Sequence, residues 1–428
     1  MDRKISPPPL KRRKLAPPDC VEDAKPEGNP PPQPLDAPKT VRLFSWNVNG
    51  IGPFVPPPSS GRITTFFKPS SGAEAVPQRS SHSLRAFLSR HNWPEVLFLQ
   101  ELKVDPANPT ALARLLSAVN TPCLGPGDRS TPDRTYTLDA SLPRDRHNAG
   151  AFQGRLYGVG TVLRADFARA HVARVRAVDW DLEGRVSIVE TRSPAPPPPA
   201  AGETRPQATK ADTEGSSSSS RLALINVYAV NGTSAPYRDP ATGAPAAGGR
   251  TRHDHKVAFH ARLRDECLGL ERRGFGVVVA GDLNVARGPL DGYPRLRTWP
   301  ARHAVNRADF NVRFFGEGDN VRAGAYVGAE GEGRGPCLDG VDAFRAVHGL
   351  ERRYTYYPRT REWGSSCDRV DLVIVSKALW ESGRVLGTGI LDSPAERGPS
   401  DHVPLWVEVA LGDLGPSEIR KPKKDGVD

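Results

Sequence analysis

The sequence predicts an α/β or α+β fold made of one domain that carries several loop insertions. Short apolar segments rich in β-branched residues predict strands, and they alternate with segments in which apolar residues recur at helical spacing. Some of these strands follow one another as hairpin-like pairs. The 428 residues include 41 glycines and 43 prolines, so long parts of the chain are not core. Without the Pro- and Ser-rich stretches, roughly 320–340 residues remain, which is ample for one large hydrophobic core.

The strands are predicted from alternation and from continuous apolar runs. Residues 41–46 alternate and favour β structure, so the first strand is expected there. Residues 96–99 form an uninterrupted apolar run, which is typical of a buried strand. Further strands are expected near 157–163, 185–190, 222–229, 277–279, 370–376 and 403–410.

Apolar residues at helical spacing predict two helices. Leu84, Phe87 and Leu88 keep this spacing in the first. The second extends over residues 259–270, and Gly274 is a suitable C-terminal cap because glycine readily takes a left-handed conformation.

The chain outside the predicted core consists of two tails and three insertions. Residues 1–40 hold eleven prolines and few large apolar residues, which predicts a disordered tail. The basic run at 11–14 is typical of a nuclear import signal or of a phosphate-binding arm, so we expect the nucleus as the location. The folded domain is expected at 41–410, with a polar tail at 411–428. Disordered insertions are expected near 52–80, 191–220 and 232–250.

The composition restricts the partners and the compartment. A formal net charge of +10 favours polyanions such as DNA, RNA or an acidic membrane surface. The five cysteines are scattered without a C-x-x-C pair, which argues against a disulfide framework or a zinc site and fits a reducing compartment. No apolar run approaches 18 residues, so we expect no membrane association through a spanning segment. The polar, Pro-rich N-terminus lacks the features of a secretory signal.

Polar residues occur where the predicted strands begin or end. In a layered sheet protein, such ends can gather on one rim, which is the usual location of a functional site. The residues at these positions are Asn47, Asn49, Gln100, Glu101, Tyr228, Asn231, Asp282, Asn284, Arg369, Asp371, Asp401 and His402.

The carboxylates and the histidine of this set suit metal-assisted hydrolysis of a phosphate ester. Glu101, Asp282 and Asp401 are hard oxygen ligands without companion thiolates, which suits Mg²⁺ or Mn²⁺. His402 with a carboxylate partner such as Asp371 would form a general base and its orienting group.

The neutral residues of the set suit phosphate binding. Asn47, Asn231 and Asn284 can donate hydrogen bonds to phosphate oxygens without adding negative charge, and Tyr228 offers a phenolic donor. The chain has no P-loop motif, so chemistry on nucleoside triphosphates is not expected. Each motif alone also has a structural interpretation, for example a turn at 281–284, but together they favour one site.

Seven short motifs occur in order between residues 41 and 410. They are S-W-N-V-N-G-I at 45–51, L-Q-E-L-K at 99–103, D-L-E-G-R at 181–185, N-V-Y-A-V-N at 226–231, G-D-L-N-V-A at 281–286, R-V-D at 369–371 and S-D-H-V-P at 400–404. This series resembles that of the exonuclease III family of apurinic/apyrimidinic endonucleases. The resemblance implies a DNase I-like fold, a four-layer α/β sandwich of two packed mixed β-sheets flanked by helices.

The resemblance also implies roles for the site residues. Glu101 would be the principal ligand of Mg²⁺, which Mn²⁺ could replace. Asp282 would activate or orient the attacking water, and His402, oriented by Asp371, would stabilise developing charge. Whether Asp282 or His402 takes the proton stays open. The implied metal ligands are Asn47, Asn49, Glu101, Asp282, Asn284, Asp401 and His402. The implied catalytic residues are Tyr228, Asp282, Asn284, Asp371 and His402. The implied substrate-binding residues are Asn231, Arg369, Tyr356 and Tyr357.

The sequence departs from the family pattern beside these residues. Leu102 stands where a threonine is usual, and Asp368 stands where a large aromatic residue often precedes R-x-D. The aromatic pair expected near an abasic-site pocket is Tyr356 and Tyr357 rather than Phe or Trp. Both tyrosines could instead pack in the core, and Arg369 could simply pair with Asp368.

The sequence therefore predicts a Mg²⁺-dependent DNA repair nuclease. We expect it to hydrolyse the phosphodiester 5′ to abasic sites in base excision repair, with 3′–5′ exonuclease or 3′-phosphodiesterase activity. Its partner would be double-stranded DNA with an abasic site or a damaged 3′ end, and it would act as a monomer. The alternatives are a general nuclease or another phosphoesterase on the same fold, such as an inositol-phosphate phosphatase, and a catalytically inactive DNA-binding module.

Overall fold

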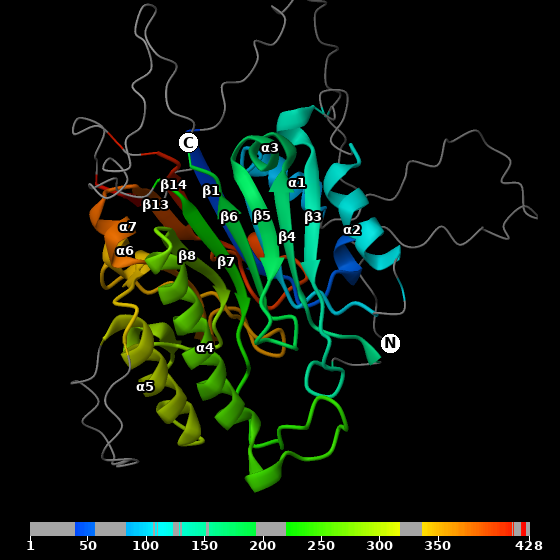
Figure 1. Ribbon diagram of the computed structural model, residues 1–428, viewed down its shortest axis with the longest axis vertical. Coiled ribbons are helices and arrows are strands. Elements are labelled where there is room, and N and C mark those ends of the chain that lie inside the picture. Colours follow the sequence, from blue (N-terminus) through cyan, green and yellow to red (C-terminus); the bar gives the residue numbers. More distant parts are fainter. Residues whose placement is uncertain are drawn as a thin grey trace, which may run out of the picture. The chain divides into compact units, whose positions relative to one another are not determined.

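Two β-sheets form the centre of the fold (Figure 1). The computed structural model describes residues 39–55, 83–105, 108, 110–122, 128, 131–150, 154–193, 220–316, 336–412, 414 and 421–424. The predicted tail at 1–40 and most of the predicted insertions near 52–80 and 191–220 therefore lie outside the described residues.

The first sheet has seven strands in the order β15-β13-β14-β1-β2-β4-β3. At its centre, β1 runs parallel to β2 and antiparallel to β14. Its strands are β1 (Thr40–Asn47), β2 (Val96–Gln100), β3 (Tyr136–Ser141), β4 (Val159–Arg164), β13 (Val385–Ile390), β14 (Leu405–Ala410) and β15 (Lys423–Lys424).

The second sheet has six strands in the order β10-β12-β8-β7-β6-β5. Here β7 runs parallel to β8, and β12 runs antiparallel to β8. Its strands are β5 (Val172–Ala177), β6 (Val186–Thr191), β7 (Leu222–Tyr228), β8 (Gly276–Asp282), β10 (Val341–Asp342) and β12 (Asp371–Val375). A separate pair joins β9 (Gly292–Tyr293) to β11 (Cys367–Asp368).

The inner faces of the two sheets bury a shared core. Side chains alternate across each strand, so Leu43 of β1 points to this core whereas its neighbours Phe44 and Trp46 pack on the outer face. Leu224 of β7 and Val278 of β8 meet Leu43 from the opposite sheet. The core between the sheets is therefore a layer of branched aliphatic residues, typical of packed sheets.

Helices cover both outer faces. Beside the first sheet, α1 (Leu84–Arg90) and α2 (Thr110–Asn120) pack on Phe44 and Trp46. Beside the second, α4 (Arg252–Arg272) and α5 (Arg302–Phe315) lie together, as Figure 1 shows. The predicted four-layer sandwich is thereby confirmed. The short helices are α3 (Ala165–His171), α6 (Ala343–His348), α7 (Lys377–Glu381) and α8 (Pro394–Arg397).

The prediction of disorder at 232–250 is wrong, because the segment forms a defined loop. Asp239 Oδ1 accepts the backbone N–H groups of Ala241 and Thr242, at 3.0 and 2.9 Å. Asn148 Nδ2 donates to the Arg238 carbonyl at 2.7 Å and so ties the loop to the domain. The Gly, Pro, Asp and Thr residues that suggested disorder are the residues that turns require.

The start of the predicted polar tail is also part of the fold. Leu411 is buried in the core, and β15 adds to β13 as a parallel strand. Within the described residues, no helix combines the length and the apolar character needed to cross a membrane.

The close approach of β8 to β7 predicts that Gly281→Ala will destabilise the protein. Gly281 has φ +149°, and a Cβ atom there would lie 2.0 Å from the carbonyl oxygen of Val227. We expect a loss of about 3 kcal/mol or more in denaturant unfolding, because backbone cannot yield as a side chain can. Gly52→Ala is the control, since a Cβ there would meet nothing within 4 Å. Equal stability of both variants would contradict the prediction.

Candidate active site

Polar residues from both sheets meet at one edge of the sandwich. The carboxyl ends of the parallel pairs β1/β2 and β7/β8 lie at this edge of their sheets. Because β12 and β14 run antiparallel to β8 and β1, their first residues come to the same edge. The residues brought together include Asn47, Glu101, Tyr228, Asp282, Asp371 and His402.

Two buried carboxylates lie side by side at the centre of this edge. The register of β8 and β12 pairs Asp282 directly with Asp371. Asp282 Oδ1 accepts the backbone N–H of Asn284 at 2.8 Å, and its Oδ2 accepts Nδ2 of Asn47 at 3.0 Å. Burial, followed by the neighbouring Asp371 carboxylate, raises the pKa of Asp282 to about 7. Asp282 is therefore able to take up a proton near neutral pH.

His402 lies between these two carboxylates. Its Nδ1 donates to Oδ2 of Asp371 at 2.7 Å, and its Nε2 lies 4.0 Å from Oδ2 of Asp282. Burial opposes a charged imidazole, but the charge and hydrogen bond of Asp371 outweigh it and raise the pKa of His402 to about 10. The ring is therefore a cation at neutral pH, with both nitrogens protonated.

Glu101 brings a further carboxylate from the other sheet. Asn47 Nδ2 lies 3.1 Å from Oε1 of Glu101 and 3.0 Å from Oδ2 of Asp282, so one amide bridges the two acids. Nζ of Lys103 lies 2.7 Å from Oε2 of Glu101 and also contacts Oδ1 of Asn49. Burial alone would raise the pKa of Glu101, but Lys103 and Asn47 together lower it, so the side chain is ionised.

The oxygens of this region fit a hard divalent cation. Glu101, Asp282 and Asp401 line one pocket, and carboxylate and amide oxygens are the ligands that Mg²⁺ and Mn²⁺ prefer. The ligand atoms of Asp282, Asp371 and His402 also lie within 4.8 Å of one another and could hold a metal.

Tyr228, Asn284 and Asn231 complete the predicted set. Burial, followed by the charge of Glu101, raises the pKa of Tyr228 well above its usual value, so the phenol keeps its proton. The guanidinium of Arg185 lies 4.7 Å from the Tyr228 ring centroid and fixes the ring from behind. Asn284 donates from Nδ2 to the Ala229 carbonyl at 2.9 Å, and Asn231 lines the same pocket.

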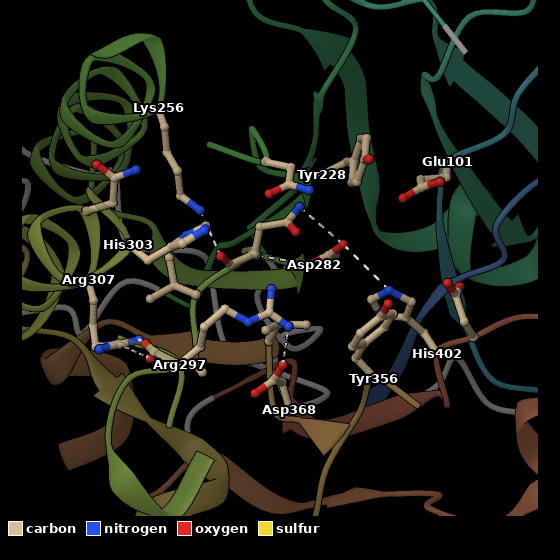
Figure 2. A pocket seen from close by; sticks show the side chains of 17 residues that line it. Glu101, Tyr228, Lys256, Asp282, Arg297, His303, Arg307, Tyr356, Asp368 and His402 are labelled. Carbon is tan, nitrogen blue, oxygen red and sulfur yellow. Dashed lines mark hydrogen bonds and ion pairs between the residues drawn. The ribbon is translucent and has the colours of Figure 1, made fainter. Parts of the chain in front are cut away.

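These groups face a pocket of about 270 Å³ (Figure 2). Figure 2 shows Glu101 and His402 on one side of the pocket and Lys256, His303 and Arg307 on the other. The pocket thus has an acidic side, able to hold a cation and a water, and a basic side, able to hold an anion.

The basic side of the pocket was not predicted from the sequence. Burial lowers the pKa of Lys256 to about 7, and its Nζ donates to the Asn284 carbonyl at 2.7 Å. The signal for Lys256 was its position, since it precedes Phe259 and Leu263 at helical spacing and so falls on the buried face of α4. His303 and Arg307 gave no signal, because α5 itself was not predicted.

Three site residues lie in strained backbone. Asn49, Glu101 and Asn284 have φ of 51°, 54° and 53°, the left-handed region that residues with side chains rarely adopt. Each follows the end of a strand, at β1, β2 and β8 respectively. The chain turns sharply at each point, which directs the side chain across the rim instead of along the sheet.

Two predicted substrate-binding residues do not line the pocket. Arg369 is completely buried and pairs with Asp342 at 2.7 Å and with Asp291 at 2.8 Å, so it joins structural elements and does not pair with Asp368. Tyr357 stacks on Trp363 with ring centroids 3.7 Å apart, within the core between the sheets.

Tyr356 and Asp368, the sequence neighbours of Tyr357 and Arg369, do line the pocket. Successive residues of extended chain point to opposite sides, so Tyr356 lines the pocket while Tyr357 is buried. The ring centroids of Tyr356 and His402 lie 5.0 Å apart. Asp368 likewise lines the pocket, whereas Arg369 does not.

Comparison with known families identifies a match over most of the chain. Residues 44–402 match the model of the Endonuclease/Exonuclease/phosphatase family. A comparison with curated protein sequences gave no match.

Several solved structures are similar to this chain. The AP endonuclease LMAP from Leishmania major is 19% identical, with a TM-score of 0.51 and coverage of 88% of this chain and 89% of that one. The catalytic domain of APE2 from Xenopus laevis is 17% identical, with a TM-score of 0.49 and coverage of 89% and 95%. The 3′ phosphatase NExo from Neisseria, bound to a product DNA hairpin, is 18% identical, with a TM-score of 0.46 and coverage of 86% and 99%. At these identities, the likeness to the Leishmania protein concerns the fold.

The paired carboxylates predict opposite effects of two isosteric substitutions at pH 8. Burial raises the pKa of Asp282 in the folded state above that of aspartate in the unfolded chain, so ionisation of Asp282 destabilises the folded state. This destabilisation is complete when the pH lies above both pKa values. Asp282→Asn should therefore match or exceed the wild-type melting temperature. Asp371→Asn should cost about 3–5 kcal/mol, since it leaves the buried His402 cation without its partner. Calorimetry that finds Asp282→Asn the less stable variant would exclude this account.

Proposed function

Because this chain belongs to the endonuclease/exonuclease/phosphatase family, we propose that it is a Mg²⁺-dependent DNA repair nuclease. It would hydrolyse the phosphodiester 5′ to abasic sites and remove damaged nucleotides from 3′ ends, in base excision repair in the nucleus. The observation that carries this proposal is the division of one pocket into an acidic side around Glu101 and a basic side around Lys256. A phosphodiester needs both, since hydrolysis requires an activated water and neutralised phosphate oxygens.

We assign distinct tasks to the residues that would surround the phosphate. A bound Mg²⁺ would polarise the phosphate and lower the pKa of a water. Glu101 would hold it, together with Asn47, Asn49 and Asp401. Asp282 would orient the attacking water and accept its proton. The water oxygen would bond to phosphorus while the bond from phosphorus to the 3′ oxygen breaks, and the released 3′ oxygen would take a proton from solvent to become a 3′-hydroxyl.

The protonation states favour Asp282 over His402 as the proton acceptor. His402 is already a cation with both ring nitrogens protonated, so it has no lone pair to offer. Asp282 has a pKa near that of a base working at neutral pH. His402 would instead donate from Nε2 to a phosphate oxygen and stabilise the charge that develops there.

Lys256, Asn284, Asn231 and Tyr228 would bind the phosphate on the remaining sides. The phenol of Tyr228 is a donor because its raised pKa keeps the proton in place. An anion beside Lys256 would favour its ammonium form, whose remaining donors would then face the phosphate.

A general nuclease or phosphoesterase without preference for abasic sites is the second candidate. Asp368 favours it, because this carboxylate lines the pocket where the family often has a large aromatic residue. An inactive DNA-binding module is disfavoured, since Glu101, Asp282 and His402 all face one pocket. Incision of a duplex with one synthetic abasic site, compared with undamaged duplex, with and without Mg²⁺, separates the candidates.

The metal assignment predicts that chelation abolishes activity and that Mg²⁺ or Mn²⁺ restores it. Glu101→Gln should raise the Mg²⁺ concentration for half-maximal rate by about tenfold or more, since one charged ligand becomes neutral. Glu266→Gln is the matched control. Glu266 lies on α4, pairs with Arg176 of β5 and does not line the pocket. Wild-type rates of Glu101→Gln at low Mg²⁺ would refute the assignment.

The basic run at 11–14 predicts that removal of residues 1–39 will leave hydrolysis intact and reduce nuclear accumulation. Fluorescent fusions of the full and the shortened chain measure the second effect, and the incision assay measures the first. A shortened chain that is inactive yet still nuclear would reverse the assignment.

A further inference from the structure

One wall of the pocket carries a single carboxylate among hydrogen-bond donors. Asp368 lies beside Arg297 and Tyr356, as Figure 2 shows, on a different side of the pocket from Glu101. None of the tasks assigned above involves Asp368, so its place in the pocket calls for a separate account.

The backbone holds the Asp368 side chain towards the pocket. Asp368 N–H donates to the Tyr356 carbonyl at 3.1 Å, and the Asp368 carbonyl accepts from Tyr356 N–H at 2.8 Å. In the two-residue strand β11, Cys367 points to the core, so Asp368 must point the other way. Gly292 of the paired strand β9 leaves room for the carboxylate, because a Cβ atom on this glycine would lie 3.2 Å from Oδ1 of Asp368.

The charge of Asp368 is only partly compensated. Among the described residues it forms an ion pair with Arg297, at 3.5 Å, and the Arg297 side chain is 60% exposed. Arg307 uses Nε and Nη2 on the carbonyls of Ala286 and Arg297, at 2.6 and 2.5 Å. Burial raises the pKa of Asp368, and Arg297 and Arg307 oppose this rise without cancelling it. A bound molecule that donates a hydrogen bond would supply what is missing.

The position of Asp368 restricts the group that can donate this bond. In a nucleic acid the group bonded to the phosphate is a sugar, so a phosphate bound by His402 and Lys256 brings a sugar to the adjacent wall. A second anion there would be repelled, and a flat apolar group would desolvate Asp368 without a partner. A neutral hydroxyl is not repelled by the carboxylate, and it gives the carboxylate a hydrogen-bond donor. The pocket, at about 270 Å³, lies below the range of typical sites for drug-sized ligands, and one sugar suits it better than a nucleoside.

We propose that Asp368 is a specificity-determining residue that accepts a hydrogen bond from a hydroxyl of the sugar next to the cleaved phosphate. This inference rests on the proposed nuclease function and names the feature of the substrate that the pocket selects. Within a strand, two sugars carry such a hydroxyl: an abasic deoxyribose, which has one at C1′, and a ribonucleotide, which has one at C2′.

The test compares pairs of duplexes that differ by a single hydroxyl. One pair has an abasic deoxyribose or its tetrahydrofuran analogue, which lacks the C1′ hydroxyl. The other pair has a ribonucleotide or the matching deoxyribonucleotide. We expect the wild type to favour the hydroxyl by about tenfold or more in kcat/KM in at least one pair, since a site built to bind a hydroxyl discriminates against its absence. The pair that responds identifies the sugar.

Two variants and a control separate the carboxylate from its ion pair. Asp368→Leu keeps the size but removes the acceptor, so the preference should fall to nearly one. Asp368→Asn keeps a neutral acceptor of the same shape, so the preference should fall without disappearing. Arg297→Gln, which disrupts an exposed ion pair but leaves the acceptor, should keep the preference.

Two outcomes would overturn the inference while leaving the proposed function standing. The first is wild-type cleavage of both members of each pair at equal rates, and the second is an unchanged preference in Asp368→Leu and Asp368→Asn. Absence of any cleavage by the wild type would instead overturn the proposed function. In that case fluorescence anisotropy with the same duplexes in EDTA decides the inference, because the wild type should bind the hydroxyl-bearing member more tightly and Asp368→Leu should not.

Discussion

The site depends on a pair of acidic residues that the sheet register forces together. Asp282 and Asp371 face one another across β8 and β12, and both are buried. Two carboxylates in such a position cannot both be ionised without a cation between them. His402 supplies that cation, and the loop that carries it is held by Ser400, whose Oγ donates to the Asn47 carbonyl at 2.6 Å. The charge balance of Asp282 and Asp371 therefore depends on the path of the chain before β14, because this path positions His402.

Hydrogen bonds between the two sheets keep the site in register. Asn47 of β1 donates to Asp282 of β8, and Gln100 Nε2 of β2 donates to Asn226 Oδ1 of β7 at 2.8 Å. Apolar packing alone would let two sheets slide, because aliphatic side chains have little directional preference. Buried polar contacts are directional and costly to break, so they fix how one sheet lies over the other. The acids of one sheet consequently meet Glu101 of the other in a defined geometry.

The sequence was informative where a strand end determines a direction. Asn47, Glu101, Asp282 and His402 each adjoin a strongly apolar run, and parallel or antiparallel pairing then leaves little choice of where they go. The sequence was less informative where a shift of one residue changes the face to which a side chain points. Tyr357 and Arg369 each adjoin a residue that lines the pocket, but alternation turns them into the core.

Other features were not predicted. The helix α5 was missed although Phe310 and Phe314 lie one turn apart on its buried face, and the basic side of the pocket was missed with it. The loop at 232–250 has the composition of a disordered segment, and only its contacts with residues such as Asn148 distinguish it from one. Contacts between residues far apart in the sequence leave no trace in either segment alone.

The left-handed turns at Asn49, Glu101 and Asn284 have a consequence for how such a protein can change. Glycine would relax the backbone at each of these positions, so selection for thermal stability alone would favour it there. Each replacement would also delete a side chain of the site. At these three positions a relaxed backbone and a complete site therefore exclude one another, so a gain in stability by glycine would cost activity.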